Sequence, residues 1–154
     1  ALAIAHAVRR TVVYGTEISS AALQAARLNR SRLRIRNVRF ARGSLLSALP
    51  RRLHGGVSVI VANVPYLPPD RREEARAFPD GTAVGTESDG LGLVRQLLRN
   101  ARTFLRPGGS LALQVADFQW PSLTIEAVKL GYTAPKTARS DAEGPVVGRL
   151  VWPE

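Results

Sequence analysis

Residues 57–69 read VSVIVANVPYLPP, an almost wholly apolar run that ends on an amide, prolines and an aromatic ring. Residues 57–62 are mostly β-branched and show no polar alternation, which predicts a strand buried on both faces in a parallel sheet. Open α/β sheets bind their ligands at the carboxyl ends of such strands. We therefore expect residues 63–66, Asn-Val-Pro-Tyr, to form part of a functional site.

The flanking sequence alternates between helix and strand patterns. Upstream we expect the end of a helix over 1–10, a strand over 11–15, a helix from Ser19 or Ser20 to about Asn29, and a strand over 38–41. Downstream we expect a short helix over 70–77 capped by Asp70, and a longer helix from Asp89 that Pro107-Gly108-Gly109 terminates. A strand over 110–116 and a helix over 120–130 follow. The chain then ends in strands over 132–137 and 146–152, joined by a turn over 141–145. Such alternation followed by a closing hairpin predicts a three-layer α/β domain.

Length and composition limit the class of protein. A chain of 154 residues with 45% hydrophobic and 22% charged residues fits one globular domain, residues 1–154. The absence of cysteine excludes disulfides and thiolate metal sites, and His6 and His54, which are isolated, predict no metal site. No apolar run has membrane-spanning length and no leader pattern is present, so we expect a cytoplasmic protein with no membrane partner.

The charge is strongly positive, with 22 basic residues against 12 acidic ones. The densest basic group consists of Arg27, Arg30, Arg32, Arg34, Arg36, Arg39 and Arg42. Such a group can bind phosphates of a nucleic acid. The alternative is that these arginines only solvate helix faces, as in an arginine-rich proteome, and a ribosome-associated protein substrate would suit the same surface.

Residues 63–66 resemble the Asn-Pro-Pro-Tyr signature of amino-methyltransferases that use S-adenosylmethionine (SAM). Residues 74–79 (EARAFP), 88–91 (SDGL) and 105–110 (LRPGGS) are similar to the segments that follow this signature in HemK-like protein-(glutamine-N5) methyltransferases. The resemblance covers nearly the whole chain. It implies the class I SAM methyltransferase fold, which is Rossmann-like, with a mostly parallel sheet and an antiparallel carboxy-terminal hairpin.

The resemblance also implies the catalytic residues Asn63, Val64, Pro65 and Tyr66. The Asn63 side-chain oxygen and the Val64 carbonyl would accept hydrogen bonds from a planar NH₂ group and stabilise the charge that grows on its nitrogen. Tyr66 would pack against the planar group. Val64 departs from the family's proline, which keeps the carbonyl but removes one ring that stiffens the loop. A structural alternative is that Asn63 caps local backbone and Tyr66 packs in the core.

For the donor, the resemblance implies contacts from Glu17, Ile18, Ser44, Leu45 and Asn63. An acid just after a strand can accept hydrogen bonds from both ribose hydroxyls of a nucleotide. Ser44 stands where relatives carry an aspartate that binds the adenine amino group, so it retains a hydrogen bond but no charge.

The resemblance therefore implies an enzyme that methylates a glutamine side chain in a translation protein, such as a peptide chain release factor or a ribosomal protein. One alternative acceptor is the N6 amine of adenine in DNA or RNA, and a second alternative is an inactive methyltransferase-like binding protein. The family's first strand, its glycine-rich SAM loop and an amino-terminal domain would precede Ala1. We therefore expect the domain to be incomplete at its amino end and the natural protein to extend upstream.

Overall fold

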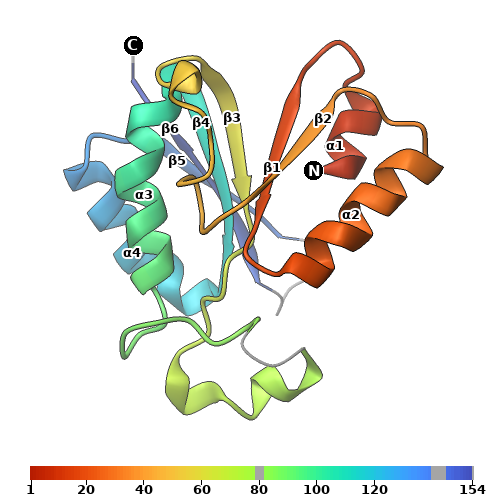
Figure 1. The fold of residues 1–154 in the computed structure, drawn as a ribbon. Helices are drawn as coiled ribbons and strands as arrows, with labels where there is room; N and C mark the ends of the chain where they lie inside the picture. The colour runs from red at the N-terminus through yellow and green to blue at the C-terminus, as the bar shows by residue number, and fades with distance from the viewer. Residues whose placement is uncertain (79–81, 140–144, 154) are drawn as a thin grey trace. The chain divides into compact units, whose positions relative to one another are not determined.

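The computed structural model describes residues 1–78, 82–139 and 145–153, which form two compact units, Ala1–Arg51 and Arg52–Glu154 (Figure 1). The helices and strands are α1 (Leu2–Ala7), β1 (Val13–Glu17), α2 (Ser20–Arg32), β2 (Val38–Arg42), β3 (Val57–Ala62), α3 (Gly92–Phe104), β4 (Leu105–Val115), α4 (Trp120–Lys129), β5 (Thr133–Arg139) and β6 (Val146–Val151). Short 3-10 turns are η1 (Arg51–Leu53), η2 (Pro69–Arg71), η3 (Glu74–Ala77) and η4 (Asp117–Gln119). Among the described residues, no helix is both long and apolar enough to cross a bilayer.

The first unit is a parallel strand pair with two helices beside it (Figure 1). In the β1-β2 ladder, Val13 lies opposite Val38 and Glu17 opposite Arg42. The predicted capping of α2 is confirmed, since the Ser19 hydroxyl accepts a hydrogen bond from the Ala22 N–H at 3.3 Å. The core of this unit contains Ala5, Ile35 and Val38, with Leu2, Val13 and Phe40 packed against them.

The second unit is a four-stranded sheet in the order β3-β4-β6-β5, with α3 and α4 on one side (Figure 1). β3 and β4 are parallel, whereas β6 runs antiparallel to both β4 and β5. Alternate residues of β4 are buried, among them Leu111, Leu113 and Val115. The α/β class, the parallel pairing and the carboxy-terminal antiparallel hairpin are therefore confirmed.

The prediction that the strand at 57–62 is buried on both faces is wrong. Ile60 is 8% exposed, but Val59 and Val61 are 58% and 60% exposed. Ile60 pairs with buried Leu111 on the helix-covered face, whereas Val61 pairs with half-buried Ala112 on the opposite face. Within the described sheet β3 also lies at an edge, because its only strand partner there is β4.

Two predicted helices also differ from the structure. α3 begins at Gly92 and ends at Phe104, because Leu105 is already extended and starts β4, so the predicted stop at residues 107–109 is wrong. Residues 70–77 contain 3-10 turns rather than one helix, and Pro68 precedes η2 without any side-chain cap, so the predicted cap at Asp70 is wrong too. The described side chains of this segment are mostly exposed, so it lacks the buried apolar face that would stabilise a longer helix. The predicted turn over 141–145 lies almost wholly outside the described residues.

Candidate functional site

The motif at residues 63–66 lies directly after the carboxyl end of β3, as predicted. Asn63 is exposed, and its side-chain amide has no hydrogen-bond partner among the described residues. The carbonyl of half-buried Val64 likewise accepts no hydrogen bond within the described part of the chain. This end of the loop therefore presents two acceptor oxygens that no described residue occupies, which is the arrangement that a bound NH₂ group requires.

Tyr66, at the other end of the motif, is held at three points. Its N–H donates to the Ala83 carbonyl at 3.1 Å, and its hydroxyl accepts a hydrogen bond from Gln114 Nε2 at 3.1 Å. Its carbonyl accepts from Gln119 Nε2 at 2.7 Å. The loop is thus fixed at the ring and open at Asn63, which argues against the alternative in which Asn63 caps local backbone.

Gln119 links three segments beneath this loop. The residue is only 3% exposed, and its Nε2 donates to the carbonyls of Tyr66 and Asp89, both at 2.7 Å. Its Oε1 accepts from the Ala116 N–H at 3.0 Å. Gln119 is not among the site residues predicted from the sequence. The available signal was a glutamine at the third position of a helical turn, from which a side chain can reach back to the N-cap N–H.

Gly90 allows the segment around Asp89 to approach the loop closely. It has a φ of +78°, and a Cβ at this position would lie 2.2 Å from the Tyr66 carbonyl oxygen and 2.7 Å from the Leu67 carbonyl carbon. No other residue combines this backbone conformation with the contact at low cost. The Asp-Gly-Leu segment therefore supports the motif by packing directly against its backbone.

Arg95 on α3 is surrounded by three carboxylates. Its guanidinium donates to both oxygens of Asp89, at 2.9 and 2.6 Å, and to both oxygens of Glu126 on α4, at 2.8 Å each. Glu87 is its third partner, and the Arg95 side chain is 20% exposed. The hydrogen bonds from Arg95 hold the pKa of Asp89 below its ordinary value. This ionic cluster ties the 87–89 segment to two helices, and it is not among the features predicted from the sequence.

In the first unit, the residues predicted to bind the donor gather at one edge of the β1-β2 pair. Glu17 is the last residue of β1 rather than the residue after it, and its carbonyl accepts from the Gly43 N–H at 3.1 Å. Thr16 Oγ1 donates to the Leu45 carbonyl at 2.6 Å. Because the two strands are parallel, Glu17, Ser44 and Leu45 lie at the same carboxyl edge. Ile18 follows β1 with an exposed side chain.

The side-chain atoms at this edge are suited to a ligand with hydroxyl groups and an apolar ring. Glu17 Oε1 accepts from the Ser19 N–H at 2.8 Å, which orients the carboxylate, while Oε2 has no partner among the described residues. The Ser44 side chain is exposed. Oε2 can therefore accept from a ligand hydroxyl, and Ile18 offers apolar surface beside it.

No protein-family model matches the chain. The release factor glutamine methyltransferase of Streptomyces coelicolor is 39% identical over 123 residues, which are 77% of this chain and 42% of that protein. The enzyme of the same name from Deinococcus radiodurans is 36% identical over 138 residues, 87% of this chain and 48% of that protein. A 4-amino-L-phenylalanine/4-methylamino-L-phenylalanine methyltransferase of Streptomyces pristinaespiralis is 34% identical over 126 residues, 80% of this chain and 42% of that protein. The chain thus spans less than half the length of these curated relatives.

Solved structures agree on the fold. A methyltransferase from Pyrococcus furiosus superposes with a TM-score of 0.71 at 19% identity, covering 99% of this chain and 68% of that one. A ribosomal protein L11 methylase from Lactobacillus delbrueckii gives a TM-score of 0.63 at 17% identity, covering 91% of this chain and 56% of that one. Together with the relatives at 30–40% identity, these findings show that the chain belongs to the HemK-like methyltransferase family and has the class I SAM methyltransferase fold.

Proposed function

We propose that the protein transfers a methyl group from SAM to the side-chain amide of a glutamine in a peptide chain release factor. The observation that carries this proposal is the Asn63 amide at the carboxyl end of β3, which has no hydrogen-bond partner among the described residues and lies on a loop anchored through Tyr66. Relatives named release factor glutamine methyltransferase support the choice of acceptor. Such a substrate would place the protein in the cytoplasm.

The chemical difficulty is that an amide nitrogen is a poor nucleophile, because its lone pair is delocalised. SAM supplies a methyl group that its sulfonium makes electrophilic. Asn63 Oδ1 and the Val64 carbonyl would accept hydrogen bonds from the two N–H bonds of the amide and orient its nitrogen. These contacts strengthen as positive charge develops on the nitrogen, so they lower the barrier more than they tighten substrate binding.

Pro65 and Tyr66 would hold this geometry. Pro65 restricts the backbone next to the Val64 carbonyl, which partly offsets the absence of a proline at residue 64. The Tyr66 hydroxyl is engaged by Gln114, so its ring has a fixed orientation against which a planar amide can pack. The contacts beneath the loop fix its Tyr66 end, which would limit the movement of the neighbouring acceptor groups and favour a preorganised geometry.

We further propose that, in the first unit, the donor is bound through Glu17, Ile18, Ser44 and Leu45. The free Oε2 of Glu17 would accept hydrogen bonds from the ribose hydroxyls of SAM, since Oε1 is already held by the Ser19 N–H. Ser44 would contact the adenine amino group with its hydroxyl. Ile18 and Leu45 would pack against the adenine ring.

The test is single-turnover methylation with labelled SAM, using the full-length protein. The acceptors are a release factor, a ribosomal protein, and an RNA and a DNA that contain adenine. We expect label on the release factor glutamine, and we expect Asn63→Ala to lower the rate by about 10²–10³ with a much smaller change in substrate affinity. The matched control is Asn100→Ala, which removes an exposed asparagine on α3 and should react at the parent rate.

Three results would contradict the proposal. If Asn63→Ala methylated at the parent rate, the loop would have no catalytic role. If label appeared on adenine and not on protein, the chemistry would stand but the acceptor would be a nucleic acid. Absence of transfer to all four acceptors, in a protein that binds SAM, would favour a binding protein over an enzyme.

A further inference from the structure

The first unit concentrates positive charge without neutralising it. Residues 1–51, all of which the structure describes, contain ten arginines and one acidic residue, Glu17. The arginines are Arg9, Arg10, Arg27, Arg30, Arg32, Arg34, Arg36, Arg39, Arg42 and Arg51. None of them forms an ion pair within this unit, where Glu17 Oε1 instead accepts from the Ser19 N–H. The charge is therefore available to an external anion.

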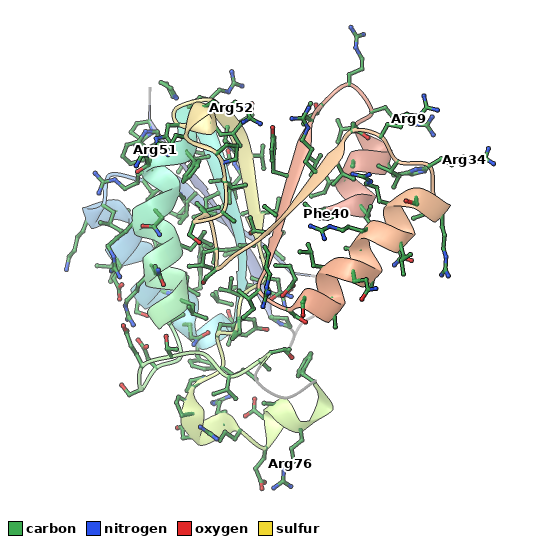
Figure 2. The ribbon with its side chains drawn as sticks, viewed as in Figure 1. Arg9, Arg34, Phe40, Arg51, Arg52 and Arg76 are labelled. Carbon is green, nitrogen blue, oxygen red and sulfur yellow. The ribbon has the colours of Figure 1, made fainter. Side chains whose placement is uncertain are left out.

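A pocket of about 460 Å³ lies among these arginines, between α1 and the connection from α2 to β2. Its floor includes the buried residues Ala5 and Ile35. Around it stand four exposed basic side chains, those of His6, Arg9, Arg34 and Arg36. Figure 2 shows Arg9 and Arg34 at the same end of this unit, both extending outward. The pocket thus combines a fixed floor with a cationic rim.

Asn37 fixes the backbone around the pocket through three hydrogen bonds. Its Nδ2 donates to the carbonyls of Ala5 at 2.9 Å, Val8 at 3.1 Å and Thr11 at 2.9 Å. These bonds join the turn that carries Arg9 to the start of β2. They also occupy three carbonyl oxygens near the end of α1, whose partial negative charge would otherwise oppose an anion.

Arg34 occupies a backbone position that normally favours glycine. Its φ is +53°, and the hydrogen bonds from Arg34 N–H to the Ser31 carbonyl at 3.1 Å and from Ile35 N–H to the Arg30 carbonyl at 3.0 Å form a Schellman end to α2. Arginine is strained in this conformation and glycine is not. An arginine in a backbone conformation that favours glycine, at the rim of a pocket, indicates that its side chain has a function there.

We propose that this pocket binds a phosphate group in the backbone of a nucleic acid. Guanidinium groups match phosphate oxygens in charge and in fork geometry, and three of them surround the pocket. Arg27 and Arg30 on α2 and Arg39 on β2 add further positive charge to the same unit, which favours a polyanion over a single small phosphate. This inference is independent of the methyl-transfer proposal.

The test is titration of fluorescently labelled single-stranded RNA with the full chain at several salt concentrations. Arg34→Gly should weaken RNA binding at least about fivefold at low salt, and should reduce the slope of log affinity against log salt by about 0.7, the value of one lost phosphate contact on a single strand. The same substitution should raise the urea midpoint of unfolding, because glycine fits the left-handed position. Loss of RNA binding together with a gain in stability would separate the phosphate contact of the Arg34 side chain from the strain of the Arg34 backbone.

The control is Arg32→Ala, which removes the same charge from an exposed position of α2 that does not line the pocket. It should weaken binding less than twofold, and Arg36→Ser, at the pocket rim, should repeat the loss seen with Arg34→Gly. Equal losses of RNA affinity in Arg32→Ala and Arg34→Gly would show that the pocket is not the binding site and that RNA is held only by diffuse positive charge. Unchanged affinity in Arg34→Gly would also overturn it. Binding of millimolar inorganic phosphate, measured by calorimetry, without any RNA binding would overturn the nucleic acid as the ligand and leave a small anion in its place.

Discussion

The two compact units of this protein use their arginines in opposite ways. In residues 52–154, twelve basic residues accompany eleven acidic ones, and Arg71, Arg76 and Arg95 all form ion pairs with carboxylates. In residues 1–51 the arginines with internal partners contact neutral groups, such as the Val38 carbonyl for Arg30 and the Tyr14 ring for Arg39. The net charge of the chain therefore resides almost entirely in the first unit.

This difference separates arginines that stabilise structure from arginines that are free for a partner. Arg95 is mostly buried and shared by three carboxylates, so its charge is already compensated by the fold. The arginines around the pocket of the first unit have no such compensation. A single net charge for the whole chain hides this distinction, and variants that remove one polar group at a time can test it.

The largest effect is expected at Gln119, which holds the second unit together beneath the motif. Gln119→Leu leaves the Ala116 N–H and the carbonyls of Tyr66 and Asp89 without this partner in a buried place. At about 1–3 kcal/mol for each such group, we expect at least about 3 kcal/mol of lost stability in urea unfolding. Gln114→Leu is the control, because it breaks only the bond to the Tyr66 hydroxyl and should cost about 1 kcal/mol. Equal losses in the two variants would mean that Gln119 does not organise this region.

An intermediate effect is expected when the same substitution is made in both units. Arg95→Met leaves Glu87, Asp89 and Glu126 close together without their shared cation, and we expect a loss of about 2–3 kcal/mol because these carboxylates remain partly open to water. Arg32→Met removes an exposed arginine that has no carboxylate partner in its unit, so stability should change by less than about 0.5 kcal/mol. Similar losses of stability in the two variants would mean that the two units do not differ in how their arginines contribute to stability.

The smallest effect is expected in the pH dependence of stability. The pKa of Asp89 is lowered by its hydrogen bonds to Arg95, so the folded state holds the ionised carboxylate more strongly than the unfolded state does. This contribution is present above the ordinary carboxyl pKa of about 3.9 and is lost as the pH falls through the lower folded value. The stability difference between the parent and Asp89→Asn should therefore shrink as the pH falls below about 4. Urea unfolding at a series of pH values measures it, and a constant difference between pH 3 and pH 7 would contradict this origin.

Much of the fold was predictable because helices and strands have local periodicities. The β-branched run at 57–62 became β3, and the apolar pattern from Leu93 onward became α3. The motif at 63–66 was predictable for the same reason, since it follows a strand directly. Gln119 and Arg95 were not predictable, because their partners lie far away in sequence: Gln119 bonds Tyr66 across 53 residues, and Arg95 bonds Glu126 across 31.

By itself, the amino-acid sequence determined the order of the helices and strands, the family, and the position of Asn63 after a strand, since these depend on neighbouring residues and short motifs. Only the tertiary structure decided which face of β3 is covered, because burial depends on strands and helices from elsewhere in the chain. It likewise decided that the Asn63 amide has no partner in the described part of the chain while Tyr66 is anchored. It also decided that Arg95 is paired with carboxylates while Arg34, in a unit that is described in full, is not. Hydrogen bonds and ion pairs act over a few ångströms, so the partner of a polar side chain is known only when the fold has brought distant segments together.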